Sequence, residues 1–378
     1  MVWVILALVA VGFAVAAPSV WIARRLGSRL GAMDTAPIEG QVKMAARPVP
    51  NTGGIGIYLG IALPLACGLI AAWALGDGSG VVGAQIGEHL PGVRSMTPLA
   101  LAFLISLTML HGVGLLDDRR PMGPWVKMVV MALAALLVAA PRAGLDTRLL
   151  TLLDAHVGGP WLSVLITVIW FVAVTNAFNF IDNMDGLCAG VASVAGGCFL
   201  AAALIGGQWF VAGTLALVVG SCLGFLLFNF PPAKVFMGDG GSLVVGFCMA
   251  FLTTRTTYLP EGDGSWRWYG VLMPIVVLAI PLYDLVSVTL VRLSQGKSPF
   301  VGDLQHFSHR LVRRGLSKRA AVLVIYGFTL VTGLAGILLA SVGAWQAAVL
   351  GAQVAALLGV LAVLEFRSRG DGARGLDA

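Results

Sequence analysis

The sequence predicts an all-α polytopic membrane protein, and three observations lead to this class. Apolar residues make up 58% of the 378 residues and charged residues only 11%, whereas roughly a quarter of the residues in an ordinary soluble protein are charged. The mean hydropathy of the chain is +0.92. Apolar runs of about 20 residues, the length that crosses the hydrocarbon core of a bilayer as a helix, recur along the whole chain.

Apolar runs between charged or turn-forming segments predict about eleven transmembrane helices. The predicted spans are residues 2–23, 53–75, 97–116, 124–141, 160–178, 187–206, 208–230, 242–258, 268–292, 319–340 and 344–364. No basic segment precedes the first run, so we expect a retained helix and not a cleaved signal peptide. We therefore expect one integral membrane domain over residues 1–366, followed by a short cytoplasmic tail at 367–378.

The distribution of Lys and Arg between the predicted spans gives the expected orientation. One set of connections, together with the tail, holds 19 of these residues, and the other set holds five. Because cytoplasmic loops of membrane proteins are enriched in Lys and Arg, the first set is expected to be cytoplasmic. This places the N-terminus outside and the C-terminus inside. Every dense polar cluster of the chain then falls on the cytoplasmic face.

The segment NAFNFIDNMDG, residues 176–186, places amides and carboxylates where a span should end. Its polar residues at steps of three are Asn176, Asn179, Asp182 and Asp185. Residues three apart are neighbours on a helix, so we expect these four to line one side of a crevice. The alternative, capping of two abutting helix ends, accounts for one or two of them. Gly186 allows the close turn that follows.

Carboxylates also lie in GLLDDRR and in FMGDGGS. Asp117 and Asp118 are adjacent and repel each other, so they stay ionised most easily near cations or a metal. The following Arg119 and Arg120 offer plain surface neutralisation as the alternative. Asp239 stands among glycines before a helix start, which suits a metal-bound pyrophosphate, or else it is a helix cap.

Two further cytoplasmic segments carry polar residues. In RPVPNTGG, residues 47–54, the glycines leave backbone N–H groups for an anion at a helix start, or they allow close helix packing. In HFSHR, His306 and His309 stand one helical turn apart beside Arg310. With arginines nearby, phosphate or sugar binding is more plausible there than zinc. Asp284 is expected to pair with a cation such as Arg292.

Carboxylate and amide oxygens without thiolates favour Mg²⁺, with Mn²⁺ as the alternative. A divalent metal beside cationic loops indicates a phosphorylated substrate, and the membrane surface indicates a lipid as the second substrate. The leading class is therefore phosphoryl-type transfer from a soluble donor to a lipid phosphate. No nucleic-acid partner is expected.

The motifs PVPNTGG, GLLDDRR, NAFNFIDNMDGL, FMGDGGS and DLQHFSH, in this order between these spans, resemble those of the polyprenyl-phosphate N-acetylhexosamine-1-phosphate transferases. The resemblance covers most of the chain. It implies that a polyprenyl phosphate, usually undecaprenyl phosphate, attacks the β-phosphorus of a UDP-N-acetylhexosamine with magnesium assistance. The products are a lipid-diphosphate sugar and UMP. It further implies the inner, cytoplasmic membrane as the location and allows a homodimer.

The resemblance also implies roles for residues of this chain. Metal binding falls to Asp239 and Asn179. Asp117 binds or deprotonates the lipid phosphate, with Asp118 beside it, while Asp182 and Asp185 organise the site. The residues expected at the donor substrate are Arg47, Asn176, Phe236, His306, His309 and Arg310, with Phe236 stacked on uracil.

Two branches of this family differ in the last motif. Consecutive histidines are typical of transfer of phospho-N-acetylmuramoyl-pentapeptide, and His-x-His-His is typical of enzymes that start O-antigen, teichoic acid or other envelope glycans. Here Ser308 takes the place of the middle histidine, Leu304 replaces a usual basic residue, and the glycan branch with GlcNAc-1-phosphate is favoured. We expect loss of the Ser308 side chain to have a mild effect. An ion-coupled secondary transporter is the alternative from another class; it would need acids near the middle of the bilayer and an internal repeat.

Overall fold

The computed structural model describes residues 1–32, 49–75, 87–140, 147–149, 154–256, 268–299, 305–339 and 341–366. Its regular elements there are helices. They are α1 (Val2–Arg29), α2 (Gly53–Ala74), α4 (Leu90–Ser95), α5 (Thr97–Arg119), α6 (Pro124–Ala139), α7 (Asp154–Val157), α8 (Trp161–Ile181), α9 (Leu187–Ile205), α10 (Trp209–Asn229), α11 (Asp239–Arg255), the 3₁₀ helix η2 (Trp268–Leu272), α12 (Met273–Val277), α13 (Ala279–Ser294), α14 (Phe307–Arg313), α15 (Lys318–Leu339) and α16 (Ala344–Phe366).

Each of the eleven predicted spans overlaps at least one of these helices. Eight helices in the described ranges are long and apolar enough to cross a membrane: α1, α2, α5, α8, α9, α10, α15 and α16. The predicted span at 268–292 is bent by 70° between Tyr269–Val277 and Ala279–Ser294, so the two together make at most one more. The apolar helix α6 is shorter, and α11 has 17 residues. The protein is thus a polytopic membrane protein.

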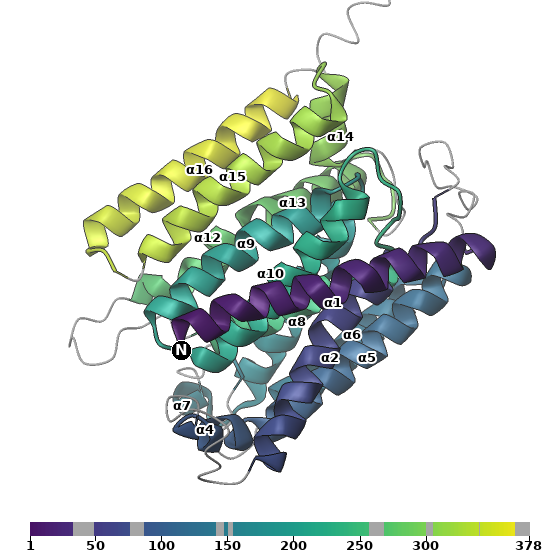
Figure 1. Ribbon diagram of the computed structural model, residues 1–378. Coiled ribbons are helices and arrows are strands. Elements are labelled where there is room, and N and C mark those ends of the chain that lie inside the picture. The colour runs from purple at the N-terminus through teal and green to yellow at the C-terminus, as the bar shows by residue number, and fades with distance from the viewer. Residues whose placement is uncertain are drawn as a thin grey trace, which may run out of the picture.

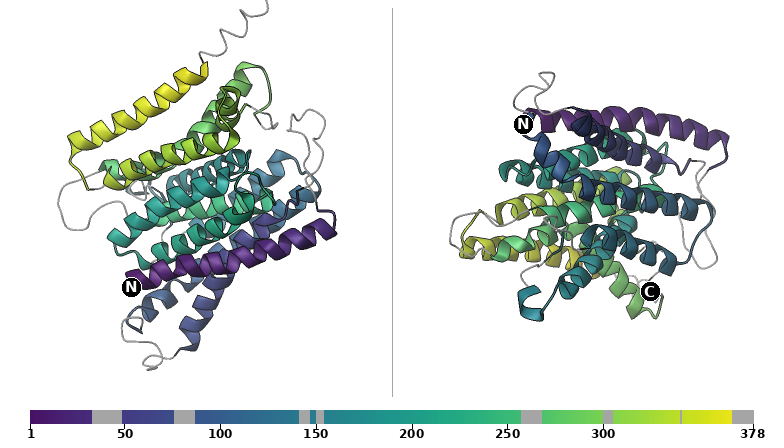
Figure 2. Two further views of the ribbon diagram at one scale, coloured as in Figure 1. Left: turned by 45° about the horizontal axis from the view of Figure 1, so that its top comes forward. Right: turned by 90° about the horizontal axis from the view of Figure 1, so that it is seen from below.

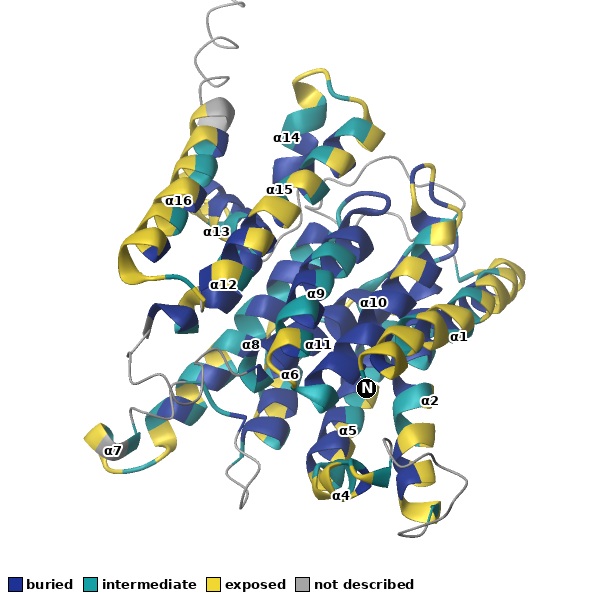
Figure 3. Ribbon diagram, turned by 60° about the vertical axis from the view of Figure 1, so that its left-hand side comes forward, coloured by how far each residue is buried: buried dark blue, intermediate teal, exposed yellow. Residues whose placement is uncertain are grey.

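Helix α11 lies at the centre of the bundle, between α2, α5 and α8. Nearly all of its residues are buried, whereas α16 on the outside is mostly exposed (Figure 3). Large apolar side chains such as Phe247 and Phe251 fill the space around α11 and stack on Phe103 of α5. The outward-facing apolar side chains of the outer helices suit a lipid environment.

The two ends of the helix bundle carry different elements. Figure 1 shows α14 at one end and the short helices α4 and α7 at the other. Helices α15 and α16 form an outer layer beside α9 and α12, while α1 crosses the opposite side over α10 (Figures 1 and 2). The C-terminal ends of α5 and α8 and the N-terminal ends of α6 and α11 meet at the end that carries α14.

Helices α1 and α10 pack so closely that their backbones nearly touch. A Cβ atom at Gly220 of α10 would lie 2.1 Å from the carbonyl oxygen of Val9, and one at Gly12 of α1 would lie 2.6 Å from that of Leu217. Small residues at such crossings let membrane helices associate through backbone contact. The N-terminal helix is therefore an integral part of the bundle.

We expect Gly220→Ala to destabilise the protein by about 1–3 kcal/mol, because the added methyl group forces α1 away from α10. Gly197→Ala is the matched control, since a Cβ atom there meets nothing within 4 Å. Thermal unfolding in detergent measures both variants. Equal melting temperatures for the two would contradict the close packing.

Candidate active site

The ammonium group of Lys127, in the first turns of α6, lies between two carboxylates from other helices. Its Nζ is 3.1 Å from Asp117 Oδ2 on α5 and 2.8 Å from Asp239 Oδ2 on α11. The three side chains are 13–23% exposed, so the cluster faces a partly open surface. The backbone N–H of Met122 also donates to Asp117 Oδ1, at 2.7 Å. One shared cation thus offsets the repulsion between two neighbouring acids.

Asp118 has a different task from its neighbour Asp117. Its carboxylate accepts hydrogen bonds from the Asn51 Nδ2 at 2.9 Å, from the Asp239 N–H at 3.0 Å and from the Gly240 N–H at 3.1 Å. The first backbone donors of α11 are therefore satisfied by α5. Gly238, with φ +67°, fits this turn because a Cβ atom would lie 2.5 Å from Asp118 Oδ2. Asp118 is an anchor that places Asp239.

Asn179, in the last turns of α8, completes the surroundings of Asp239. Its Nδ2 donates to Asp239 Oδ1 and to Ser242 Oγ, each at 2.9 Å. Asp182 follows at the C-terminal end of α8. Burial, followed by the charges of Asp239, Asp118 and Asp185, raises the pKa of Asp182 well above its ordinary value. Asp182 therefore tends to keep its proton where α5, α8 and α11 bring these acids together.

The expected line of four polar residues holds only in part. Asn176 lies farther back in α8, where its Nδ2 donates to its own helix at Val172 O and to Met131 Sδ of α6. Asp185 lies beyond the end of α8 and accepts from the Ala233 N–H at 2.9 Å. The chain leaves the helical path after Ile181, so the step of three no longer keeps side chains on one face.

The turn after α8 is held from α10 and α15. Gly186 has φ +77°, as the sequence predicted for a close turn. Its N–H donates to Asn229 Oδ1 at 2.8 Å, and its carbonyl accepts a hydrogen bond from the Tyr326 hydroxyl. Asn229 Nδ2 also donates to Val235 O. The polar turn is therefore rigidly attached to the bundle.

The histidines lie at the start of α14. His306 Nδ1 is 2.8 Å from Asp284 Oδ2, and the Phe307 N–H donates to Asp284 Oδ1 at 2.7 Å. We expected Asp284 to pair with a cation such as Arg292, but the side chain that contacts it is His306, and Arg292 donates to Pro299 O. Asp284 is almost fully buried, so it fixes the orientation of His306.

His309 stands one turn after His306, with the ring centroids 6.5 Å apart. Burial, His306 and Arg313 lower the pKa of His309 to about 4. His309 is therefore neutral at neutral pH and can exchange hydrogen bonds with uncharged groups. Arg310 donates to Ser287 Oγ of α13 at 2.8 Å.

The glycine-rich start of α2 does not offer free N–H groups for an anion. The Gly53 N–H donates to Phe236 O at 2.9 Å and the Gly54 N–H to Met237 O at 3.0 Å. A Cβ atom at Gly54 would lie 2.4 Å from the backbone of Gly241. Of the two alternatives for these glycines, the structure supports close packing and not an anion site. Phe236 is half-buried beside this segment, and Arg47 lies outside the described residues.

Lys127 and Asn51 were not assigned a role from the sequence. The position of Lys127 could have indicated a role. A cation in the first turn of a helix interacts unfavourably with the helix dipole, so a nearby acid is expected to offset this unfavourable interaction. Arg119 and Arg120, the cations considered for Asp117 and Asp118, are exposed. For Asn51 the sequence offered no signal, because its partner Asp118 is 67 residues away.

The donors in this cluster suit a magnesium ion. Asp239 offers carboxylate oxygens, and amide and further carboxylate oxygens lie close by on Asn179 and Asp182. Within the described ranges no three His, Cys, Asp or Glu side chains form a ready metal cage. Mg²⁺ commonly uses only one or two carboxylates together with substrate phosphates, so the donor set fits a metal that binds with a phosphorylated substrate.

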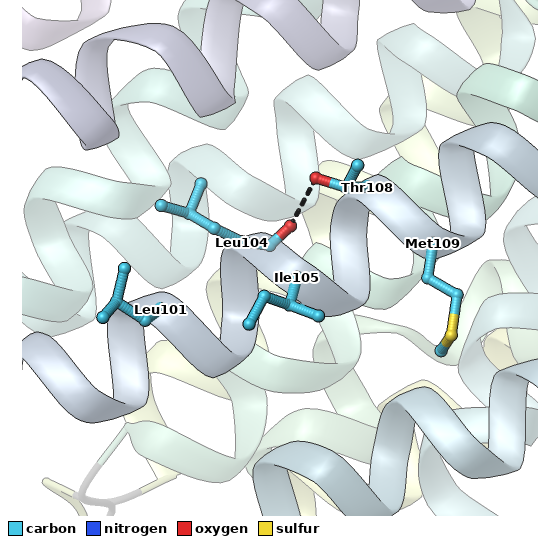
Figure 4. Close-up of a pocket in the computed structure, with 5 residues that line it drawn as sticks. All are labelled: Leu101, Leu104, Ile105, Thr108 and Met109. Carbon is cyan, nitrogen blue, oxygen red and sulfur yellow. Dashed lines mark hydrogen bonds between the residues drawn. The ribbon is translucent and has the colours of Figure 1, made fainter.

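An apolar hollow lies on the outward face of α5 and contains none of the candidate site residues. Its lining residues are Leu101, Leu104, Ile105, Thr108 and Met109 (Figure 4). The Thr108 hydroxyl donates to Leu104 O of its own helix and also bonds Tyr58. The candidate site residues described above lie at the helix ends and not in this hollow.

Taken together, these helix ends carry carboxylates, one lysine and two histidines, and they form the candidate active site. Comparison with known proteins gives the family. Residues 100–257 match the family model described as glycosyl transferase family 4. The chain is 30% identical over 331 residues to the decaprenyl-phosphate N-acetylglucosaminephosphotransferase of Mycobacterium tuberculosis (strain H37Rv), covering 80% of this chain and 74% of that one. The chain belongs to glycosyl transferase family 4.

Other relatives carry similar names. The probable undecaprenyl-phosphate N-acetylglucosaminyl 1-phosphate transferase of Bacillus subtilis (strain 168) is 29% identical over 86% of this chain and 82% of its own. The undecaprenyl-phosphate alpha-N-acetylglucosaminyl 1-phosphate transferase of Yersinia pestis is 28% identical over 85% and 79%. These matches confirm the family that the motifs indicated.

We expect the two adjacent acids to respond differently to removal. Asp118→Ala takes away the acceptor of three hydrogen bonds and should destabilise the protein by about 3 kcal/mol. Asp117→Ala relieves repulsion with Asp239 while losing contacts to Lys127, so stability should change by less than about 1 kcal/mol. Thermal unfolding of both variants in detergent checks this. A larger loss for Asp117→Ala than for Asp118→Ala would contradict the anchor role.

Proposed function

We propose that this protein transfers GlcNAc-1-phosphate from UDP-GlcNAc to a polyprenyl phosphate. An oxygen of the lipid phosphate bonds to the β-phosphorus of the donor. The bond from that phosphorus to the bridging oxygen breaks, and UMP leaves with this oxygen. The observation that carries the proposal is the cluster of Lys127, Asp117 and Asp239 at the ends of apolar helices. The names of the relatives support both substrates.

The position of the cluster supports a cytoplasmic active site. The described residues Arg119, Arg120, Arg313 and Arg314 lie at the ends of α5 and α14, on the side of the chain that the positive-inside rule places in the cytoplasm. Under this assignment the N-terminus is outside and the C-terminus inside. Sugar nucleotides are metabolites of the cytoplasm, so we place the protein in the cytoplasmic membrane. There it starts the synthesis of an envelope glycan.

Mg²⁺ is the proposed cofactor, held by Asp239 and the amide oxygen of Asn179, with Asp182 nearby. A bound Mg²⁺ would neutralise the charge of the pyrophosphate as the phosphorus–oxygen bond breaks. Asp118 keeps Asp239 in place through the N-terminus of α11. Asn179 orients Asp239 through its Nδ2 hydrogen bond.

Lys127 and Asp117 act on the lipid phosphate in this proposal. Lys127 provides positive charge for the approach of an anion to a surface that otherwise carries acids. Asp117, paired with Lys127, orients the lysine and accepts a proton if the phosphate brings one. Because the lipid phosphate is already anionic, it needs little activation, and direct attack is favoured over a covalent enzyme intermediate.

The remaining residues are proposed to hold the donor. His306 precedes α14 as its N-cap residue, and His309 and Arg310 lie within this short helix; all three are proposed to contact the sugar and pyrophosphate. Phe236 is proposed to contact uracil. Asn176 bonds to its own helix and is the weakest of the expected substrate contacts.

The alternatives have less support. Transfer of phospho-N-acetylmuramoyl-pentapeptide is not named for the relatives above. A secondary transporter needs acids along a path through the bilayer, whereas Asp117, Asp182 and Asp239 stand at helix ends. A homodimer stays a prediction.

Asp239→Ala is expected to lower Mg²⁺-dependent UMP release from UDP-GlcNAc and undecaprenyl phosphate by at least about 100-fold, because the main hard oxygen ligand is lost. Glu88→Gln, an exposed acid at the other end of the bundle, is the control. UDP-GalNAc and UDP-MurNAc-pentapeptide, assayed with the same lipid, test donor choice. Full activity of Asp239→Ala would refute the metal assignment, and faster release from another donor would refute the GlcNAc assignment.

The raised pKa of Asp182 predicts a pH dependence of metal binding. Asp182 keeps its proton to a higher pH than an ordinary carboxyl, and a bound cation favours its ionised form. Mg²⁺ binding should therefore release a proton at low pH, and affinity should increase as pH rises through the raised pKa. Calorimetric titration of Mg²⁺ with UDP-GlcNAc present, between about pH 5 and pH 8, measures this. The same slope in Asp182→Asn would contradict the prediction.

A further inference from the structure

The side chain of Asn183 connects the end of α8 to the start of α14. Asn183 lies between Asp182 and Asp185, after the end of α8. Its Nδ2 donates to the Phe180 carbonyl at 2.7 Å, and its Oδ1 accepts a hydrogen bond from the Ser308 hydroxyl of α14. The side-chain amide therefore bonds to α8 through its nitrogen and to α14 through its oxygen.

Ser308 occupies the first turn of α14 and is 1% exposed. It lies between His306 and His309, the two residues proposed to contact the donor. Asp284 of α13 holds the same turn from another side, through His306 and the Phe307 N–H. The start of α14 is thus attached to α13 by one acid and to the end of α8 by one neutral hydrogen bond.

A contact between two rings is a second link between α8 and the start of α14. The Phe180 ring lies edge-on to the His306 ring, with centroids 5.9 Å apart and planes at 88°. Phe180 thus meets Asn183 through its carbonyl and His306 through its ring. A displacement of α14 away from α8 breaks the Ser308 hydrogen bond and the ring contact together. The two contacts therefore both fix the position of α14 relative to α8.

The chemistry of this connection suits a neutral part of the substrate. Asn183 and Ser308 are both uncharged, so their hydrogen bond does not depend on which anions or cations occupy the acidic cluster. His309, next to Ser308, is neutral at neutral pH because its pKa is lowered to about 4. A neutral imidazole exchanges hydrogen bonds with sugar hydroxyl or acetamido groups without a competing charge.

We propose that the Asn183–Ser308 hydrogen bond is a positioning contact that sets the distance between the acidic cluster and the histidines, and that it thereby governs binding of the N-acetylhexosamine part of the donor. The proposal rests on the proposed function for the identity of the donor. It assigns no contact with the lipid phosphate. It differs from the expectation that loss of the Ser308 side chain is mild, because the hydroxyl donates a hydrogen bond to Asn183.

A double-mutant cycle tests the contact. Ser308→Ala, Asn183→Ala and the double variant are compared in steady-state UMP release with UDP-GlcNAc and undecaprenyl phosphate varied separately. Each single variant should raise the KM for UDP-GlcNAc about tenfold, as expected when a buried hydrogen-bonding group loses its partner. The kcat and the KM for the lipid should stay within about threefold, and the double variant should be no worse than either single one. Ser308→Thr, which keeps the hydroxyl, should restore binding.

Ser221→Ala is the matched control, because Ser221 is fully buried and donates only to Leu217 O within its own helix. Independent effects of the two single variants, an equal rise in the KM for the lipid, or the same defect in Ser221→Ala would overturn the proposal.

Hydrogen exchange gives a readout that needs no turnover. The amides of Phe307–Arg313 should exchange faster in Ser308→Ala and in Asn183→Ala than in the unmodified protein, and unchanged exchange in both would overturn the positioning role. If the unmodified protein released no UMP from UDP-GlcNAc, the proposed function and the donor part of this inference would fail, while exchange would still decide whether the contact positions α14.

Discussion

The ammonium group of Lys127 is the interaction on which the site depends. It draws together Asp117 from α5 and Asp239 from α11, two acids that would otherwise repel each other across the opening. A cation between two carboxylates offsets the repulsion between them, because each acid gains an attraction that opposes it. The cation also gives an anionic substrate a favourable point of approach on an acidic surface.

The rest of the end of the bundle supports this arrangement. Asp118 uses its carboxylate to hold the backbone at the start of α11, and Asn179 holds the side chain of Asp239 from α8. The turn after α8 is fastened by Asn229 and by Tyr326. Each of these groups is used to fix geometry, so the positions of Lys127, Asp117 and Asp239 are set before any substrate arrives.

The sequence predicted the helices well because a bilayer imposes a length and a composition on each span, and both are visible locally. It also predicted that Asp117, Asp239 and Asn179 belong to one site, since each stands at the end of an apolar run. It could not separate the tasks of Asp117 and Asp118, because their partners lie on other helices, more than 100 residues away for Asp118 and Asp239. It left two alternatives open for Gly53 and Gly54, whose N–H groups are satisfied by the loop before α11. It extended the line of polar residues to Asp185, which lies past the end of α8. These properties depend on tertiary contacts that no local pattern encodes.

The most direct test of the account is the turnover number of Lys127→Met for UMP release from UDP-GlcNAc and a polyprenyl phosphate at saturating Mg²⁺. Methionine keeps much of the length of the side chain and removes its charge. The account predicts a loss of about 100-fold or more in kcat, with Arg29→Met, an exposed cation at the end of α1, close to the unmodified protein. Turnover of Lys127→Met within about twofold of the unmodified protein would contradict the central role given to this cation.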